Sequence, residues 1–242
     1  MKPAPLSPRA RLTRTATRLA GGLALSLLLP GVVLAGGKAI MEATGKRQGE
    51  TMDVEMTITW SAQHTRMDLS SQPGTYMILR DNKSYTVTNQ GGRVMVFNMA
   101  QLGQMAPGGG GGQKDTAMGP DSVASLESME PTGSTETVAG IEGEVYRVKW
   151  TDTRGKSHDD MAVLSDEAVV VGLMEAFQRY VDGVGTGASD PLSQAVVDRG
   201  MGMLRFGDRM EVTSIEAMEP PATTFELPAE PMDLNKMMQR GR

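Results

Sequence analysis

Residues 51–60 show the clearest alternation of apolar and polar side chains in the chain (TMDVEMTITW). The apolar members of this pattern are Met52, Val54, Met56, Ile58 and Trp60. Successive side chains of a strand point to opposite faces, so the spacing predicts a strand with one apolar and one polar face. A helix is excluded because a period of 3.6 residues would scatter the same apolar side chains around its axis.

Shorter patterns of the same kind predict further strands, and turn residues such as Pro73-Gly74, Asp81-Asn82 and Gly91-Gly92 separate several of them. These strands are expected at residues 38–45, 64–69, 75–80, 83–88, 93–98, 157–164, 203–206, 210–217 and 224–227. No helical segment separates the first six strands. A meandering antiparallel sheet is therefore expected, rather than a parallel sheet with crossover helices.

The stretch Thr135–Trp150 is expected to lead from a turn into a long strand that contains Val145, Tyr146, Val148 and Trp150. Two glycines lie early in this stretch. Gly140 and Gly143 stand where the backbone must bend tightly or take a positive φ, which glycine adopts at little cost.

Asp166–Asp182 is the best helix of the sequence, with Ser165 as its N-cap and apolar side chains at helical spacing. At 1.5 Å per residue it would be about 25 Å long, enough to lie across a sheet. A second helix is expected over Pro191–Arg199, a weak one over Met118–Met129 and a helical turn over Met99–Met105. Strands and helices together predict an α+β fold.

Residues 1–35 have the three-part layout of a secretory signal peptide. Five basic residues and no acidic residue precede the apolar run Leu19–Leu34, and Val33 and Ala35 supply the small side chains of a cleavage site. The alternative is a membrane anchor. An anchor needs about 20 unbroken apolar residues, whereas this run contains Pro30.

Removal of the leader would leave 19 basic and 29 acidic residues, a net charge of −10. Such a balance argues against nucleic acid and anionic membrane surfaces as partners, because both attract basic patches. The chain has no cysteine, which excludes disulfides and a lipidated N-terminal cysteine. A protein of the periplasm is expected, without stable membrane insertion after cleavage. Its oligomeric state stays open.

Two segments carry a resemblance. Residues 138–146 (VAGIEGEVY) and the ending FELP at 225–228, followed by Met232, Met237 and Met238, resemble the DUF4412 family of exported bacterial proteins. That family belongs with the LolA/LolB-like lipoprotein carriers. This chain departs from the pattern at Gly143, where a cysteine is common, and at Glu230-Pro231, where an aromatic residue is missing.

The resemblance implies a strongly curved antiparallel sheet, an unclosed β-barrel, with helices covering its concave face. The LolA-like domain would span residues 36–228. It would contain a flexible glycine-rich loop at 106–121 and be followed by a loose C-terminal tail at 229–242.

No catalytic constellation stands out, so the protein is expected not to be an enzyme. His158 lies among acidic residues and could hold a metal or be part of an acid–base pair. A histidine in such surroundings is more often a solvated surface group. The run Gly108–Gly112 lacks the Gly-Lys-Ser/Thr of a phosphate loop. No cofactor and no structural metal site are expected. An alternative is that methionine thioethers, which are soft ligands, bind Cu(I). That site would use methionines 201, 203, 232, 237 and 238.

Methionine is abundant, at 20 residues, while aromatic residues make up only 4% of the chain. Methionine is flexible and suits a deformable interior. Two functions remain open: an apolar cavity that binds an acyl chain or a lipidated partner, or an envelope interaction module whose core is filled by its own side chains. In the first case the ligand-binding residues are expected to be Met52, Val54, Met56, Ile58, Trp60, Met67, Met77, Met95, Leu173 and Phe177.

Overall fold

The computed structural model describes residues 36–47, 50–101, 122–184 and 190–232. The described residues belong to one compact unit, Val33–Arg242. The expected signal peptide, the whole of the predicted glycine-rich loop at 106–121 and residues 233–242 of the expected tail lie outside the described residues. No helix within the described ranges is long and apolar enough to cross a membrane.

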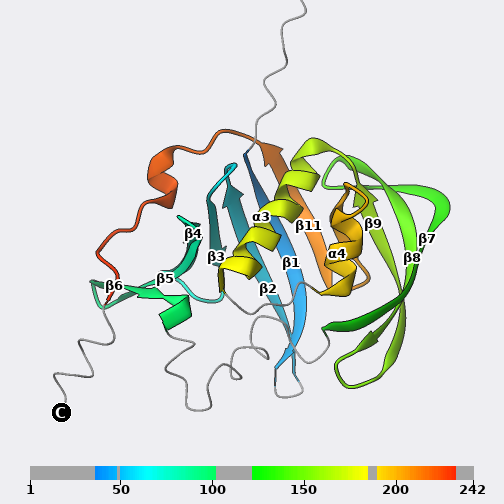
Figure 1. The fold of residues 1–242 in the computed structure, drawn as a ribbon, viewed down its shortest axis with the longest axis horizontal. Coiled ribbons are helices and arrows are strands. Elements are labelled where there is room, and N and C mark those ends of the chain that lie inside the picture. The colour runs from blue at the N-terminus through cyan, green and yellow to red at the C-terminus, as the bar shows by residue number, and fades with distance from the viewer. Residues whose placement is uncertain (1–35, 48–49, 102–121, 185–189, 233–242) are drawn as a thin grey trace, which may run out of the picture. The chain divides into compact units, whose positions relative to one another are not determined.

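Eleven strands form a single antiparallel sheet in the order β6-β5-β4-β3-β2-β1-β11-β10-β9-β8-β7 (Figure 1). The strands are β1 Gly37–Arg47, β2 Glu50–Trp60, β3 Thr65–Leu69, β4 Thr75–Arg80, β5 Lys83–Gln90, β6 Arg93–Asn98, β7 Val123–Val138, β8 Ile141–Asp152, β9 Ser157–Ser165, β10 Gly202–Phe206 and β11 Met210–Ala217. Strands β6 and β7 are the two edges, so the sheet is not closed. The expected meander of the first six strands is confirmed.

Helix α3, Ala168–Val184, lies across the sheet, and the strands curve around it (Figure 1). The helix contacts β1 to β5, β10 and β11. Its buried residues Val170, Leu173 and Ala176 pack with Ile58 and Met67 of the sheet. Helix α4, Pro191–Val197, packs against β7 and β10, and Asp190 caps its N-terminus. Both helices thus cover one face of the sheet, as expected.

The two ends of α3 differ from the prediction. The helix begins after Asp166 and Glu167, although the Ser165 hydroxyl does accept the backbone N–H of Glu167 at 3.3 Å. The helix also continues through Gly183 instead of ending there. A Cβ at Gly183 would lie 2.5 Å from Leu79 Cδ1, so glycine allows the last turn to approach the sheet closely.

The weak helix predicted over 118–129 is wrong, because the described part of this segment belongs to β7. Its sequence lacks a clear period, and the ladder of backbone hydrogen bonds with β8 decides its conformation. The stretch Thr135–Trp150 forms a hairpin, in which a turn at Ala139 and Gly140 joins the end of β7 to β8, so the expected turn and the strand after it are confirmed.

The two glycines of this hairpin serve different purposes. Gly140 has a φ of +80°, as the turn requires. Gly143 lies inside β8, where an added Cβ would stand 2.7 Å from the carbonyl oxygen of Leu164 on β9. Close packing of two backbones, rather than a special dihedral angle, therefore requires glycine at this position.

The strand expected at 224–227 is also wrong. Ala222–Phe225 forms a short 3-10 helix, η1, after Pro220 and Pro221, which have no N–H for a β-ladder. Beyond it, Leu227 packs against a second small core of Tyr85, Val87 and Val96. The backbone N–H of Met232 donates to the carbonyl of Val96 on the edge strand β6 at 2.8 Å.

Candidate functional site

A cavity of about 620 Å³ lies between α3 and the sheet. Its volume falls within the usual range for small-molecule sites, about 300–1,000 Å³. Its wall contains side chains from strands β1 to β5, β10 and β11, from helices α3 and α4, and from Met99 just after β6. The lining residues are Met41, Ala43, Met56, Met67, Leu69, Gln72, Thr75, Tyr76, Met77, Thr86, Met99, Leu173, Met174, Phe177, Tyr180, Val181, Ser193, Met203 and Met210.

The chemistry of this wall is uniform. Eight of the 19 lining residues are methionines, and none of the lining residues that the structure describes carries a charge. Methionine has three rotatable bonds and a polarizable sulfur, so its side chain adapts to the shape of whatever fills the space. Such a wall suits an apolar ligand of variable shape.

Five of the ten residues predicted to face a ligand line this cavity: Met56, Met67, Met77, Leu173 and Phe177. Ile58 lies on the same face of β2 as Met56 but is fully buried in the core under α3. Val54 and Met95 are half-buried and pair with Ala43 and Thr88 in the sheet. The side chain of Met52 lies outside the described set.

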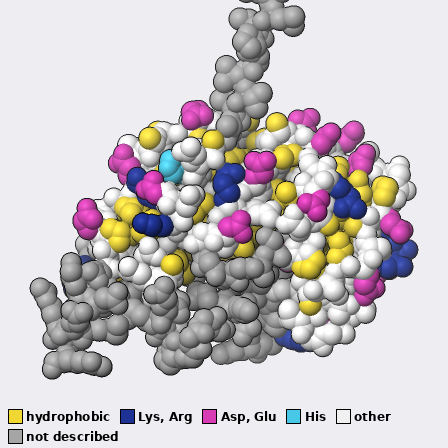
Figure 2. Space-filling view, viewed as in Figure 1, with side chains coloured by type: hydrophobic (Ala, Val, Ile, Leu, Met, Phe, Trp, Pro, Cys, Tyr) yellow, Lys and Arg dark blue, Asp and Glu magenta, His cyan; other side chains and the backbone are white. Residues whose placement is uncertain are grey.

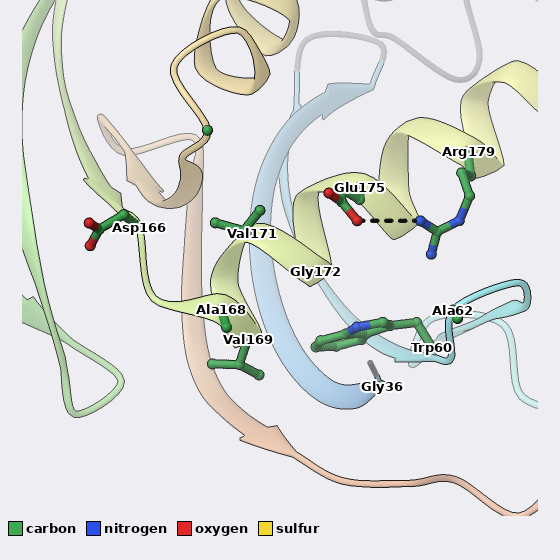
Figure 3. Close-up of a pocket in the computed structure, with 11 residues that line it drawn as sticks. Gly36, Trp60, Ala62, Asp166, Ala168, Val169, Val171, Gly172, Glu175 and Arg179 are labelled. Atoms are coloured by element: carbon green, nitrogen blue, oxygen red, sulfur yellow. Dashed lines mark ion pairs between the residues drawn. The ribbon is translucent and has the colours of Figure 1, made fainter. Parts of the chain in front are cut away.

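Trp60 lies in a separate hollow of about 480 Å³ on another flank of α3 (Figure 3). Its indole lies beneath Gly172, where an added Cβ would stand 3.1 Å from the indole Nε1. On the same helix, Arg179 pairs with Glu175 at 3.7 Å and donates to the carbonyl of Ser61 at 3.2 Å. Because the indole is only 1% exposed, this tryptophan acts as a support for α3.

Sequence reasoning missed lining residues from β1, β10 and β11, among them Met41, Met203 and Met210. Alternation in β1 (Ala39, Met41, Ala43) would have identified an apolar face, but nothing local shows that this face adjoins the cavity. Tyr180 lies within the helix predicted over Asp166–Asp182, and its hydroxyl reaches the cavity wall, where it donates to Met77 Sδ at 2.7 Å.

The cavity holds few polar atoms. The Thr86 hydroxyl donates to Met99 Sδ at 2.9 Å, and the Thr75 hydroxyl donates to Thr88 Oγ1 at 3.3 Å. Burial raises the pKa of the Tyr180 hydroxyl to about 12, because the apolar surroundings disfavour the phenolate. Tyr180 is therefore a neutral donor at physiological pH.

His158 is not the solvated surface group that its acidic neighbours suggested, because its side chain is only 12% exposed. Its ring stacks on Trp150 with 4.1 Å between the centroids. Its Nε2 lies 3.0 Å from a carboxylate oxygen of Asp152, and its Nδ1 lies 3.3 Å from a guanidinium nitrogen of Arg209. These partners come from β8 and the β10–β11 turn, so the cluster joins two parts of the sheet.

Asp152 gives a prediction for acid stability. A hydrogen bond with His158, followed by the backbone N–H groups of Lys156 and Arg154, lowers the pKa of the Asp152 carboxyl to about 2. A depressed carboxyl pKa stabilises the fold above the unfolded value of about 3.9, and this contribution is lost as the pH falls toward 2. We expect the stability difference between wild type and Asp152→Asn to shrink between pH 4 and pH 2, as measured by urea unfolding. A difference that stays constant over this range would contradict the assignment.

Metal ligands do not gather in the described part of the chain, where no group of three or more His, Asp or Glu side chains could hold an ion. The methionines considered for Cu(I) are also separated. Met203 lies on β10, while Met232 lies beside β6, and six strands lie between β10 and β6 in the sheet order. Met237 and Met238 fall outside the described residues. On the face shown in Figure 2, acidic and basic side chains are interspersed.

No family model matches the chain, and no curated protein matches it. Among solved structures, the chain is similar to one described as "Structure of PNGF-II in C2 space group", with 10% identity and a TM-score of 0.30. The similarity covers 78% of this chain and 29% of that chain. The chain thus spans less than a third of that protein, and this likeness says nothing about function.

Proposed function

We propose that this protein is a periplasmic binding protein whose cavity accepts an acyl chain or the acyl group of a lipidated partner, without catalysis. The observation that carries the proposal is the cavity of about 620 Å³ with a methionine-rich wall. A module with a self-filled core would not need such a space beneath its main helix. The described lining residues offer no charged group that would attract an ionic substrate.

The energetics of an acyl chain fit this wall. Each buried methylene contributes about 0.8 kcal/mol, so the 14 methylenes of a 16-carbon chain contribute about 11 kcal/mol at full burial. Association costs about 4–15 kcal/mol in lost freedom. Where the association cost is below about 11 kcal/mol, burial of the chain supplies affinity without any specific polar contact. Flexible methionines would tolerate different chain lengths.

The unclosed antiparallel sheet with α3 across one face also supports the LolA-like relationship that we propose for residues 36–228. In such an arrangement the helix forms one wall of the ligand space and the sheet forms the other. Leu173 and Phe177 on α3 line the same cavity as Met56, Met67 and Met77 of the sheet.

The test uses the full chain, expressed in bacteria and purified after export. We expect an organic extract of the protein to contain acyl lipid by mass spectrometry. We also expect N-phenyl-1-naphthylamine, a neutral apolar fluorophore, to brighten on binding and to be displaced by added acyl lipid. A clean extract together with no fluorophore response would instead favour an envelope interaction module with no lipid cargo.

A further inference from the structure

The polar groups of the cavity are concentrated at one end. Gln72 precedes β4, Thr75 lies on β4, Thr86 lies on β5, and Tyr180 reaches the wall from the C-terminal half of α3. The wall formed by β1, β10 and β11 contributes only Met41, Ala43, Met203 and Met210. In the sheet, β4 and β5 are separated from β11 by at least three strands. A ligand in this cavity would therefore meet one polar and one apolar end.

Ser193 on α4 is the polar lining residue away from that end. Its hydroxyl donates to the carboxylate of Asp190, which caps the same helix, so its one donor hydrogen is already used by the protein.

Two hydroxyl groups at the polar end have poor acceptors. Tyr180 donates to the sulfur of Met77, and Thr86 donates to the sulfur of Met99. Thioether sulfur is a weak acceptor compared with a carbonyl oxygen. Met77 and Thr86 face each other across the β4–β5 ladder, so the two hydroxyls lie around one place on the wall. Flexible methionine side chains can move aside when a stronger acceptor arrives.

An ionised ligand group would be poorly accommodated at this place. None of the described lining residues can neutralise a carboxylate or phosphate, and burial already disfavours charge on Tyr180. A neutral carbonyl needs only a hydrogen-bond donor, and the hydroxyls of Tyr180 and Thr86 can supply one.

We propose that the cavity recognises the uncharged carbonyl of an acyl ester or acyl amide, which accepts hydrogen bonds from Tyr180 and Thr86, while the acyl tail extends toward Met41 and Met210. This inference rests on the proposed function and narrows it to neutral acyl lipids rather than free fatty acids. The methionine sulfurs hold the two hydroxyls in place before the ligand binds.

The experiment measures displacement of N-phenyl-1-naphthylamine from the full chain at pH 8 by methyl dodecanoate and by ionised dodecanoate. We expect the ester to bind at least about tenfold more tightly than dodecanoate. Tyr180→Phe keeps the ring and removes the donor, so it should weaken the ester about three- to tenfold, as expected for one neutral hydrogen bond. Thr86→Val should act in the same direction and serves as the second variant if Tyr180→Phe fails to fold.

Tyr146→Phe is the matched control, because the Tyr146 hydroxyl donates to Glu144 and does not line the cavity. It should leave the affinities for the ester and the fluorophore unchanged. The carbonyl assignment would be overturned if the ester bound wild type and both hydroxyl variants with equal affinity, or if ionised dodecanoate bound more tightly than the ester. In either case, binding of the fluorophore would still support an apolar site. If neither fluorophore nor ester binds, the proposed function itself fails, and the carbonyl assignment fails with it.

Discussion

Val170→Asp should lower the free energy of unfolding by about 4 kcal/mol, the scale seen when a charge is left without a partner in a protein interior. Val170 is fully buried in the core cluster that joins α3 to β1, β2 and β3. Space around it is tight, since an added Cβ at Gly202 would lie 2.2 Å from the Val170 carbonyl oxygen. The carboxylate therefore cannot be accommodated by a small shift of the helix. Urea unfolding followed by circular dichroism measures the loss.

Val94→Asp is the matched control, because it introduces the same side chain at a position on β6 that is 38% exposed. We expect a change within about 0.5 kcal/mol there, as for most surface substitutions. If the two variants unfold at the same urea concentration, α3 is not packed on the sheet as the structure has it, and the cavity beneath the helix loses its wall.

Met56→Glu should abolish most binding of an apolar ligand while leaving the protein folded. Met56 is half-buried and lines the cavity, and glutamate has nearly the same length as methionine. Its carboxylate can stay hydrated in the unliganded cavity but must lose that water, or take up a proton, when an acyl chain fills the space. We expect the affinity for N-phenyl-1-naphthylamine at pH 7 to fall at least about tenfold, as measured by fluorescence titration.

Met161→Glu makes the same substitution outside the cavity, at a side chain that is 42% exposed. It should bind the fluorophore like wild type. Partial recovery of binding by Met56→Glu at acid pH would agree with protonation of the new carboxyl group. Unchanged affinity of Met56→Glu at pH 7 would mean that the fluorophore binds elsewhere, which would remove the main support for a ligand cavity.

The strands with strict alternation were predictable because their conformation follows from a local pattern. In β2 every second residue from Met52 to Trp60 is apolar, and only an extended chain places those side chains on one face. The apolar stripe on α3 was equally clear, and its members Val170 and Leu173 are buried against the sheet. Where the local pattern was weak, as in residues 123–129, pairing with β8 made a strand from a segment that was predicted to be helical.

The residues that line the cavity were only partly predictable. An apolar face can be identified from sequence, but a core position and a cavity position look alike along a strand. Ile58 and Met56 are two residues apart on the same face of β2, yet Ile58 is sealed under α3 and Met56 faces the cavity. The difference depends on where the helix crosses the strand, which no local pattern records.

By itself, the sequence determined the extended and helical segments with strong periodicity, because the backbone geometry of a strand or a helix places regularly spaced side chains on one face. Only the tertiary structure decided which of those faces surround empty space. A cavity is what remains after distant elements have packed, and here its wall is drawn from β1 to β5, β10, β11 and both α-helices. The pairing of Tyr180 and Thr86 with methionine sulfur likewise arises from contacts between segments far apart in the chain or across a turn.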